Sequence, residues 1–182
     1  TTAVPDGPLF GNGDIGVSVC ATQNDYGQAL DATQQNLTFR IGKNDFWHAT
    51  YPRSSGASSA GCKGVATLKL FSVPLKDAAF RARQVLRTAD AEIDLENENL
   101  HLHVSAYAPY GQELILLDVQ ALRGDIPLRV SLTPLEDEEA DYSLHTCGNL
   151  ICITKEYVRE VKWETKAACV CRIPAWEKTD WV

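Results

Sequence analysis

The chain has 182 residues, enough to bury one sizeable hydrophobic core. Hydrophobic residues make up 45% of it, which is typical of a globular protein and excludes a disordered chain. The formal net charge of −7 argues against a nucleic-acid partner, because binding a phosphate backbone needs a basic surface. No apolar run approaches the roughly 20 residues of a membrane span, and no motif calls for a cofactor.

Several features together favour a secreted protein. The chain contains no Met and opens with Thr-Thr-Ala-Val-Pro, as removal of a signal peptide would leave it. Asn36-Leu37-Thr38 is an N-glycosylation sequon, which is used only in a secretory compartment. The cysteines are even in number, lack zinc-site spacing and are therefore expected to form disulfides. They are Cys20, Cys62, Cys147, Cys152, Cys169 and Cys171. We expect the last four to pair among themselves, which leaves Cys20 for Cys62.

The apolar residues alternate with a period of two along most of the chain, which is typical of half-buried strands. The alternating segments are 15–20, 65–71, 93–95, 100–107, 114–122, 128–132, 150–154 and 167–173. Gly148-Asn149 is expected to join two strands in a hairpin, and Glu98-Asn99 to turn one strand into the next. Only residues 77–88 and 156–166 could hold helical turns, and the first of these could equally be a strand. Roughly ten short strands predict an all-β fold, an antiparallel β-sandwich in a single domain spanning residues 1–182.

Two motifs in the first third of the chain are distinctive. Residues 8–17 (PLFGNGDIGV) form a glycine-rich turn that enters a strand, and residues 37–47 (LTFRIGKNDFW) follow about twenty positions later. This pair resembles the start of the N-terminal β-supersandwich domain of glycoside hydrolases of the α-L-fucosidase (family 95) and maltose-phosphorylase (family 65) kind. The resemblance implies a supersandwich-like fold and a carbohydrate ligand.

The sequence departs from that family in two respects. The family's catalytic carboxylates lie mainly in an (α/α)6 barrel that follows the sandwich, and no segment here resembles such a barrel. The family's sandwich is also longer by several strands, and this chain ends on Trp176 and Trp181, whose apolar surface would normally meet a partner. We therefore expect a second polypeptide chain, from a cleaved precursor, or a homo-oligomer to complete the fold.

One ten-residue segment combines the groups that bind sugars, namely aromatic rings and planar polar side chains. The expected sugar-binding residues are Asn44, Asp45, Trp47, His48 and Arg53, with Trp176 from the tail. On a strand, Asp45 and Trp47 share one face, whereas Asn44, Phe46 and His48 share the other. The alternative for Phe46 and Trp47 is that they pack in the core, and Trp163, Trp176 or Trp181 could supply the platform instead.

No catalytic or metal site is expected. Asp14, Asp25 and Asp45 are candidate acids only by neighbourhood, since an Asp beside a glycine turn usually forms the turn. His101-Leu102-His103 places two imidazoles on one strand face, but solvent-facing histidines explain this pattern without a metal. The acidic residues 136–139 are expected to form a solvated loop rather than a calcium site.

The sequence thus predicts a secreted carbohydrate-binding protein, comparable to a free-standing invertebrate (sponge-type) lectin, that derives from the non-catalytic sandwich of a glycoside hydrolase. Two alternatives stay open at this point. The chain could be a fragment of a secreted glycoside hydrolase, or a structural subunit without a sugar ligand.

Overall fold

The computed structural model describes residues 7–22, 35–48, 61–75, 78–135, 137, 139–158 and 163–174. Within these residues the chain is mostly strand, with one 3-10 turn at Val73–Leu75 and no α-helix. The strands are β1 (Leu9–Gly11), β2 (Ile15–Thr22), β3 (Gln35–His48), β4 (Gly61–Ser72), β5 (Ala79–Val85), β6 (Asp90–Glu96), β7 (His101–Tyr107), β8 (Leu116–Arg123), β9 (Arg129–Pro134), β10 (Asp141–Cys147), β11 (Leu150–Tyr157) and β12 (Thr165–Arg172). The predicted all-β class is confirmed.

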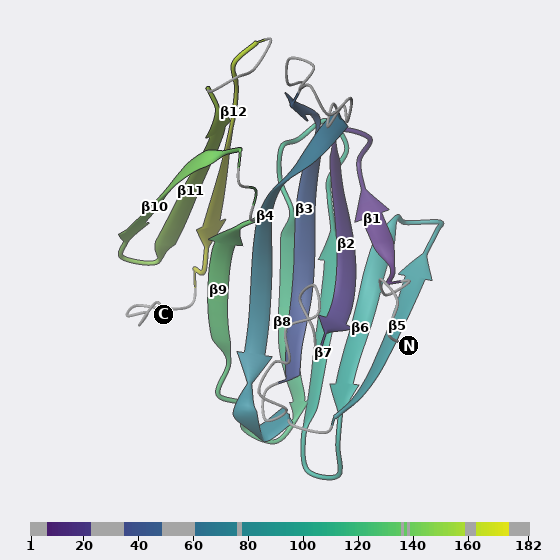
Figure 1. Ribbon diagram of the computed structural model, residues 1–182. Helices are drawn as coiled ribbons and strands as arrows, with labels where there is room; N and C mark the ends of the chain where they lie inside the picture. Colours follow the sequence, from purple (N-terminus) through teal and green to yellow (C-terminus); the bar gives the residue numbers. More distant parts are fainter. Residues whose placement is uncertain are drawn as a thin grey trace, which may run out of the picture. The chain divides into compact units, whose positions relative to one another are not determined.

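The strands form three antiparallel sheets (Figure 1). Their orders are β1-β2-β3-β4-β9, β5-β6-β7-β8 and β10-β11-β12. The second and third sheets are meanders, because each strand pairs with the next one along the chain. The chain folds as two compact units, and β3, β4 and β9 contribute residues to both. The first unit comprises Thr1–Phe39 with Lys69–Val130, and the second comprises Arg40–Leu68 with Ser131–Val182.

The first unit is a sandwich of two sheets. Every second residue of β6 and β7 is buried, as the period of two requires for strands with one face on a core. The opposing sheet contributes buried side chains from β2 and the beginning of β3, including Val19 and Leu37. In Figure 1, β1 and β2 lie in front of the β5–β8 sheet, and β1 contacts β6 and β7.

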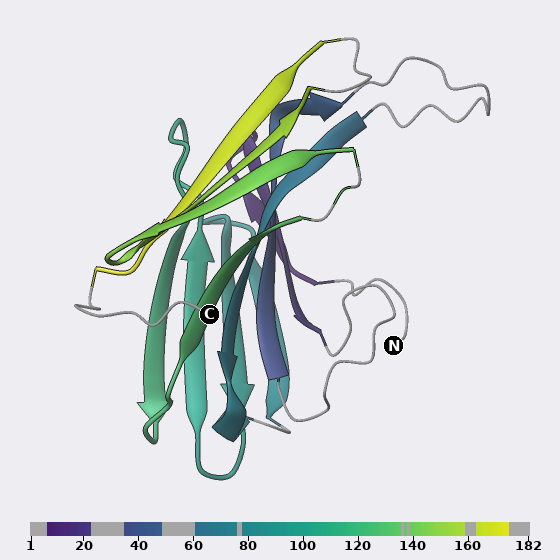
Figure 2. The same ribbon diagram turned by 60° about the vertical axis from the view of Figure 1, so that its left-hand side comes forward.

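The second unit has its own core beneath the β10–β12 sheet, whose three strands run side by side in Figure 2. Ile151, Ile153, Lys155 and Tyr157 alternate along β11 and are all buried. The Tyr157 ring contacts Phe46 of β3, with 5.5 Å between ring centroids. This core therefore contains a lysine and a tyrosine hydroxyl, and both polar groups need partners.

Local turn chemistry explains the predicted hairpins. Gly148-Asn149 joins β10 to β11, and Gly148 has φ of 56°, which suits the type II′ hairpin turn with glycine at its first position. Between β6 and β7, the Asn97 side chain accepts hydrogen bonds from the backbone amides of Asn99 and Leu100 at 3.1 and 2.9 Å. Both expected turns are confirmed.

The described residues of segments 77–88 and 156–166, where the sequence allows helical turns, form no helix. Residues 79–85 are strand β5, because each residue pairs in register with β6, from Ala79 with Glu96 to Val85 with Asp90. In the segment 156–166, strand β11 continues to Tyr157 and β12 begins at Thr165. Hairpin pairing with β6 therefore outweighs any helix preference of residues 79–85.

The cysteines also differ from expectation, since no disulfide joins any of the six, all of which lie within the described residues. The strand register separates Cys152 from Cys169 and Cys171. Cys169 and Cys171 lie opposite Ile153 and Ile151 on the inner face of the β10–β12 sheet, whereas Cys152 lies opposite His145 on the outer face. Burial raises the pKa of Cys169 to about 11, so this thiol stays protonated at neutral pH.

Candidate functional site

The turn of residues 11–14, which belongs to the first distinctive motif of the sequence, is built around Asn12. Its side-chain oxygen accepts hydrogen bonds from the backbone amides of Asp14 and Ile15 at 3.0 and 2.9 Å. Its side-chain amide donates to the backbone oxygens of Pro109 and Gln112 at 2.9 and 2.8 Å. The asparagine therefore forms the turn and also fastens it to the loop after β7, so its role in this motif is structural.

The second motif places a tryptophan on the surface of the second unit. Trp47 is 48% exposed, whereas its neighbours Phe46 and His48 are buried on the opposite face of β3, as the predicted alternation requires. The indole N–H donates to the Asn44 backbone oxygen at 2.5 Å, and the Thr165 hydroxyl donates to the Trp47 backbone oxygen at 2.8 Å. The ring is thus both exposed and held in place.

A charged pair lies beside this ring. The Lys43 ammonium is 3.0 Å from the Asp45 carboxylate, whose side chain is 69% exposed. Asp45 and Trp47 are two residues apart on a strand and therefore share a face. We call Lys43, Asp45 and Trp47 the Trp47 surface. It offers an aromatic face, a carboxylate and an ammonium group within one strand segment.

The other predicted sugar-binding residues divide into three groups. Asn44 is exposed but alternates to the other side of the strand from Trp47. His48 is 1% exposed, so it belongs to the core rather than to the Trp47 surface. Arg53, Trp176 and the candidate acid Asp25 lie outside the described residues, as does the side chain of Asn36.

The second unit contains a buried polar network that the sequence does not predict. The Tyr157 hydroxyl donates to the Asp137 carboxylate at 2.6 Å, and the His48 ring stacks on the Tyr157 ring with 4.1 Å between centroids. Glu139 approaches the His48 Nδ1 atom at 3.3 Å. The acidic loop expected to be solvated therefore turns Asp137 and Glu139 toward the core, because buried aromatic polar groups need partners.

Lys155 completes this network. Its ammonium donates to the backbone oxygens of Leu135 and Gly64 at 2.7 and 3.1 Å. Burial lowers the pKa of Lys155, and the Asp137 charge opposes this change. Burial by itself would raise the pKa of Asp137, but the hydrogen bond from Tyr157 and the other surrounding donors and cations outweigh it and hold that pKa below its ordinary value. Lys155 and Tyr157 are both buried, so their hydrogen bonds satisfy polar groups inside the core of the second unit.

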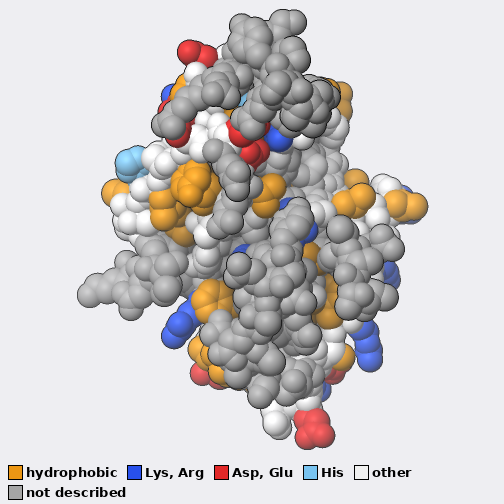
Figure 3. All heavy atoms as spheres, viewed as in Figure 1, with side chains coloured by type: hydrophobic (Ala, Val, Ile, Leu, Met, Phe, Trp, Pro, Cys, Tyr) orange, Lys and Arg blue, Asp and Glu red, His pale blue; other side chains and the backbone are white. Residues whose placement is uncertain are grey.

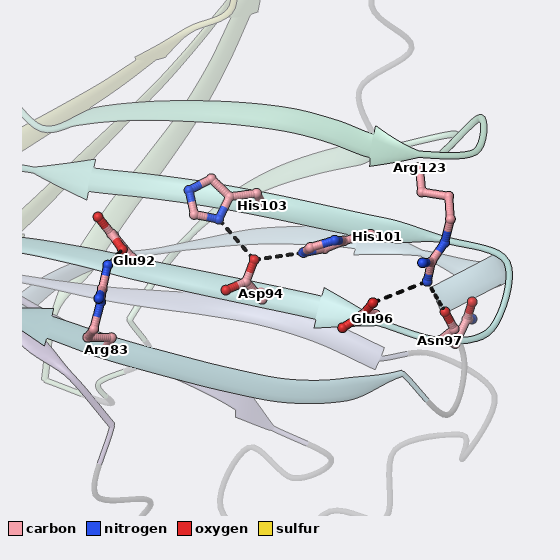
Figure 4. Close-up of polar contacts among 8 residues, drawn as sticks. All are labelled: Arg83, Glu92, Asp94, Glu96, Asn97, His101, His103 and Arg123. Atoms are coloured by element: carbon pink, nitrogen blue, oxygen red, sulfur yellow. Dashed lines mark hydrogen bonds and ion pairs between the residues drawn. The ribbon is translucent and has the colours of Figure 1, made fainter.

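A third polar cluster lies on the outer face of the β5–β8 sheet in the first unit (Figure 4). It consists of Asp94, His101 and His103, and we call it the Asp94 cluster. The two histidines of β7 both bond one carboxylate oxygen of Asp94, with distances of 2.8 Å to His101 Nε2 and 2.9 Å to His103 Nδ1. These bonds hold the pKa of Asp94 below its ordinary value although burial opposes them. The sequence pattern indicates the histidine pair but not Asp94. Asp94 lies opposite His103 because of the register between β6 and β7.

The Asp94 cluster is a hydrogen-bonded arrangement rather than a metal site. Ligands of a tetrahedral zinc ion, each about 2.0–2.1 Å from the metal, lie more than 3 Å from one another. Here the donor and acceptor atoms are closer, at 2.8 and 2.9 Å. Within the part of the chain that the structure describes, no group of three or more His, Cys, Asp or Glu side chains is arranged to hold a metal ion.

Charged side chains do not gather into a single patch on the face shown in Figure 3, where blue and red groups of the described residues are scattered. No helix among the described residues is long and apolar enough to span a membrane. A comparison with protein-family models found no match, and a search of curated proteins found none either.

Proposed function

We propose that this protein is a secreted carbohydrate-binding protein, a lectin on a β-sandwich scaffold, and that the Trp47 surface is its binding site. The observation that supports this proposal is the state of Trp47, which is 48% exposed although its indole N–H is held by the Asn44 backbone oxygen and its own backbone oxygen by the Thr165 hydroxyl. An exposed indole leaves apolar surface in contact with water, which is unfavourable. The C–H face of a sugar ring can cover that surface and so gain binding free energy. Fixing the ring in advance lowers the entropy that binding must remove.

The neighbouring ion pair suits the polar edge of a sugar. Asp45 can accept hydrogen bonds from hydroxyl groups, and Lys43 can donate to ring or hydroxyl oxygens. Burying the exposed half of one indole, about 100 Å² of surface, contributes roughly 2–3 kcal/mol. One such site is expected to bind in the millimolar range, and several copies presented together would raise the avidity.

The test is glycan-array binding by the intact chain, compared with the variants Trp47→Ala and Trp163→Ala. Trp163 is a matched control because it is 47% exposed, almost the same as Trp47. We expect the array signal to fall at least about tenfold in W47A, which corresponds to about 1.4 kcal/mol, and to stay near wild type in W163A. Equal losses in both variants, or no array signal with wild type, would overturn the proposal.

A second measurement separates binding from chemistry. The lectin proposal expects no turnover when the same protein is incubated with a panel of nitrophenyl glycosides. Turnover that survives purification and disappears with substitution of Asp45 would contradict a purely binding role and favour the hydrolase alternative.

A further inference from the structure

We propose that the outer face of the β5–β8 sheet is a second ligand site, which binds an extended, uncharged oligosaccharide along strand β7. The site lies in the first unit, contains no residue of the Trp47 surface and does not depend on it. Its central feature is the β7 row, defined as His101, His103, Ser105 and Tyr107. These residues alternate along the strand and share the outer face, while Leu102 and Val104 between them are buried.

The length of the β7 row suits an extended ligand. From His101 to Tyr107 there are six residue steps of about 3.4 Å each, so the row spans about 20 Å. Polar side chains of the flanking strands lie on both sides of it. The register places Glu96, Asp94 and Glu92 of β6 on one side, and Arg123, Gln120 and Asp118 of β8 on the other.

The carboxylates on this face already have hydrogen-bond or ion-pair partners, which favours an uncharged ligand over an anionic one. Asp118, for example, accepts a hydrogen bond from the Gln120 side-chain amide at 2.7 Å. Glu92 pairs with Arg83, and Glu96 lies 3.2 Å from the Arg123 guanidinium. Asp94 is held by both histidines, as Figure 4 shows. A phosphate, sulfate or carboxylate ligand would have to displace these partners, whereas a neutral hydroxyl can share their donors and acceptors.

The polar groups of the face are also held in fixed positions. The side chains of His101 and His103 are only 23% and 25% exposed, and each bonds Asp94. In Figure 4 the second ring nitrogen of His103 lies on the side of the ring away from Asp94. Binding to such groups removes little side-chain entropy, because their rotamers are already restricted.

One end of the row is apolar. Tyr107 lies directly opposite Leu116 of β8, and both remain exposed, Tyr107 by 40%. Solvent-facing residues of an antiparallel sheet are usually polar, so an exposed tyrosine–leucine pair beside a polar row is unusual. The tyrosine ring can stack on the C–H face of a sugar while the polar row binds the hydroxyls of the following units.

The test is an NMR titration of the isotope-labelled full chain, which reads the ring signals of His101 and His103 and the backbone amide of Tyr107. The probes are linear β-1,4-linked hexasaccharides of glucose, mannose and xylose, the three monosaccharides, and a sulfated hexasaccharide. We expect at least one neutral hexasaccharide to shift these signals, with a dissociation constant at least about tenfold lower than that of its monosaccharide. If no neutral hexasaccharide shifts them up to about 10 mM, or if the sulfated probe binds more tightly, the proposal is wrong, and the face is then an ordinary solvated sheet surface.

Variants locate the binding. Tyr107→Ala is expected to weaken binding at least about tenfold, and His103→Gln gives a second, milder perturbation should the first affect folding. Tyr142→Ala is the matched control, because Tyr142 is also an exposed tyrosine on a strand but lies in the second unit. Trp47→Ala should leave the titration unchanged, so a failure here is distinguishable from a failure of the Trp47 proposal. Equal effects of Y107A and Y142A would overturn the assignment.

Discussion

Removing the Asn12 side chain tests whether the first motif is a structural clamp. Asn12→Ala deletes four hydrogen bonds of 2.8–3.0 Å, two within the turn to the amides of Asp14 and Ile15 and two to the loop carbonyls of Pro109 and Gln112. At about 1 kcal/mol each, with a reduction for partial exposure, we expect a loss of roughly 2–3 kcal/mol in the free energy of unfolding. For a chain of this size that lowers the melting temperature by about 4–12 °C.

Asn12→Asp separates the two halves of this role. The aspartate keeps an oxygen for the amides of Asp14 and Ile15 but replaces the donor that faces the loop carbonyls by a second acceptor. Urea unfolding should therefore show a loss in both variants, while hydrogen exchange of the two turn amides should stay slow only in N12D. Asn99→Ala, at an exposed turn asparagine, is the control. A loss in N12A within about 0.5 kcal/mol of that in N99A would refute the clamp.

Three further predictions concern Gly11, Asp137 and Cys169. Gly11→Ala should destabilise the protein by more than about 1–2 kcal/mol, because the added Cβ would lie 2.4 Å from the Ile15 backbone oxygen. Gly16→Ala is the control and should be tolerated, because its Cβ would have no atom within 4 Å. Equal melting temperatures of the two variants would contradict the prediction. The pKa of Asp137 is lower in the folded state than in the unfolded chain. Ionised Asp137 therefore stabilises the folded protein at neutral pH, and this contribution is lost as the pH falls through the folded-state pKa. Tyr157→Phe removes the hydrogen bond that helps to lower the Asp137 pKa. The difference in unfolding free energy between wild type and Y157F should therefore narrow below about pH 4. A difference that stays constant from about pH 7 to 2 would contradict this prediction. With its pKa raised to about 11, Cys169 should be alkylated much more slowly at pH 8 than the exposed thiols, as mass spectrometry of labelled peptides would show; rapid labelling would disprove its burial.

The sequence by itself determined the strand periodicity, the hairpin at Gly148-Asn149 and the division of β3 into two faces. These features depend on local rules, since side chains of a strand alternate and glycine permits the backbone of a tight turn. That is why the placement of Trp47 and Asp45 on one face, opposite Phe46, could be predicted.

Only the tertiary structure decided which side chains meet across strands. Asp94 precedes His101 by seven positions, and Lys155 bonds a carbonyl at Gly64, 91 residues away. No local pattern encodes such pairings, because they follow from register and from the order of strands in a sheet. The same applies to Asp137, whose carboxylate looks like part of a solvated acidic run in sequence and turns inward because a buried tyrosine hydroxyl needs an acceptor.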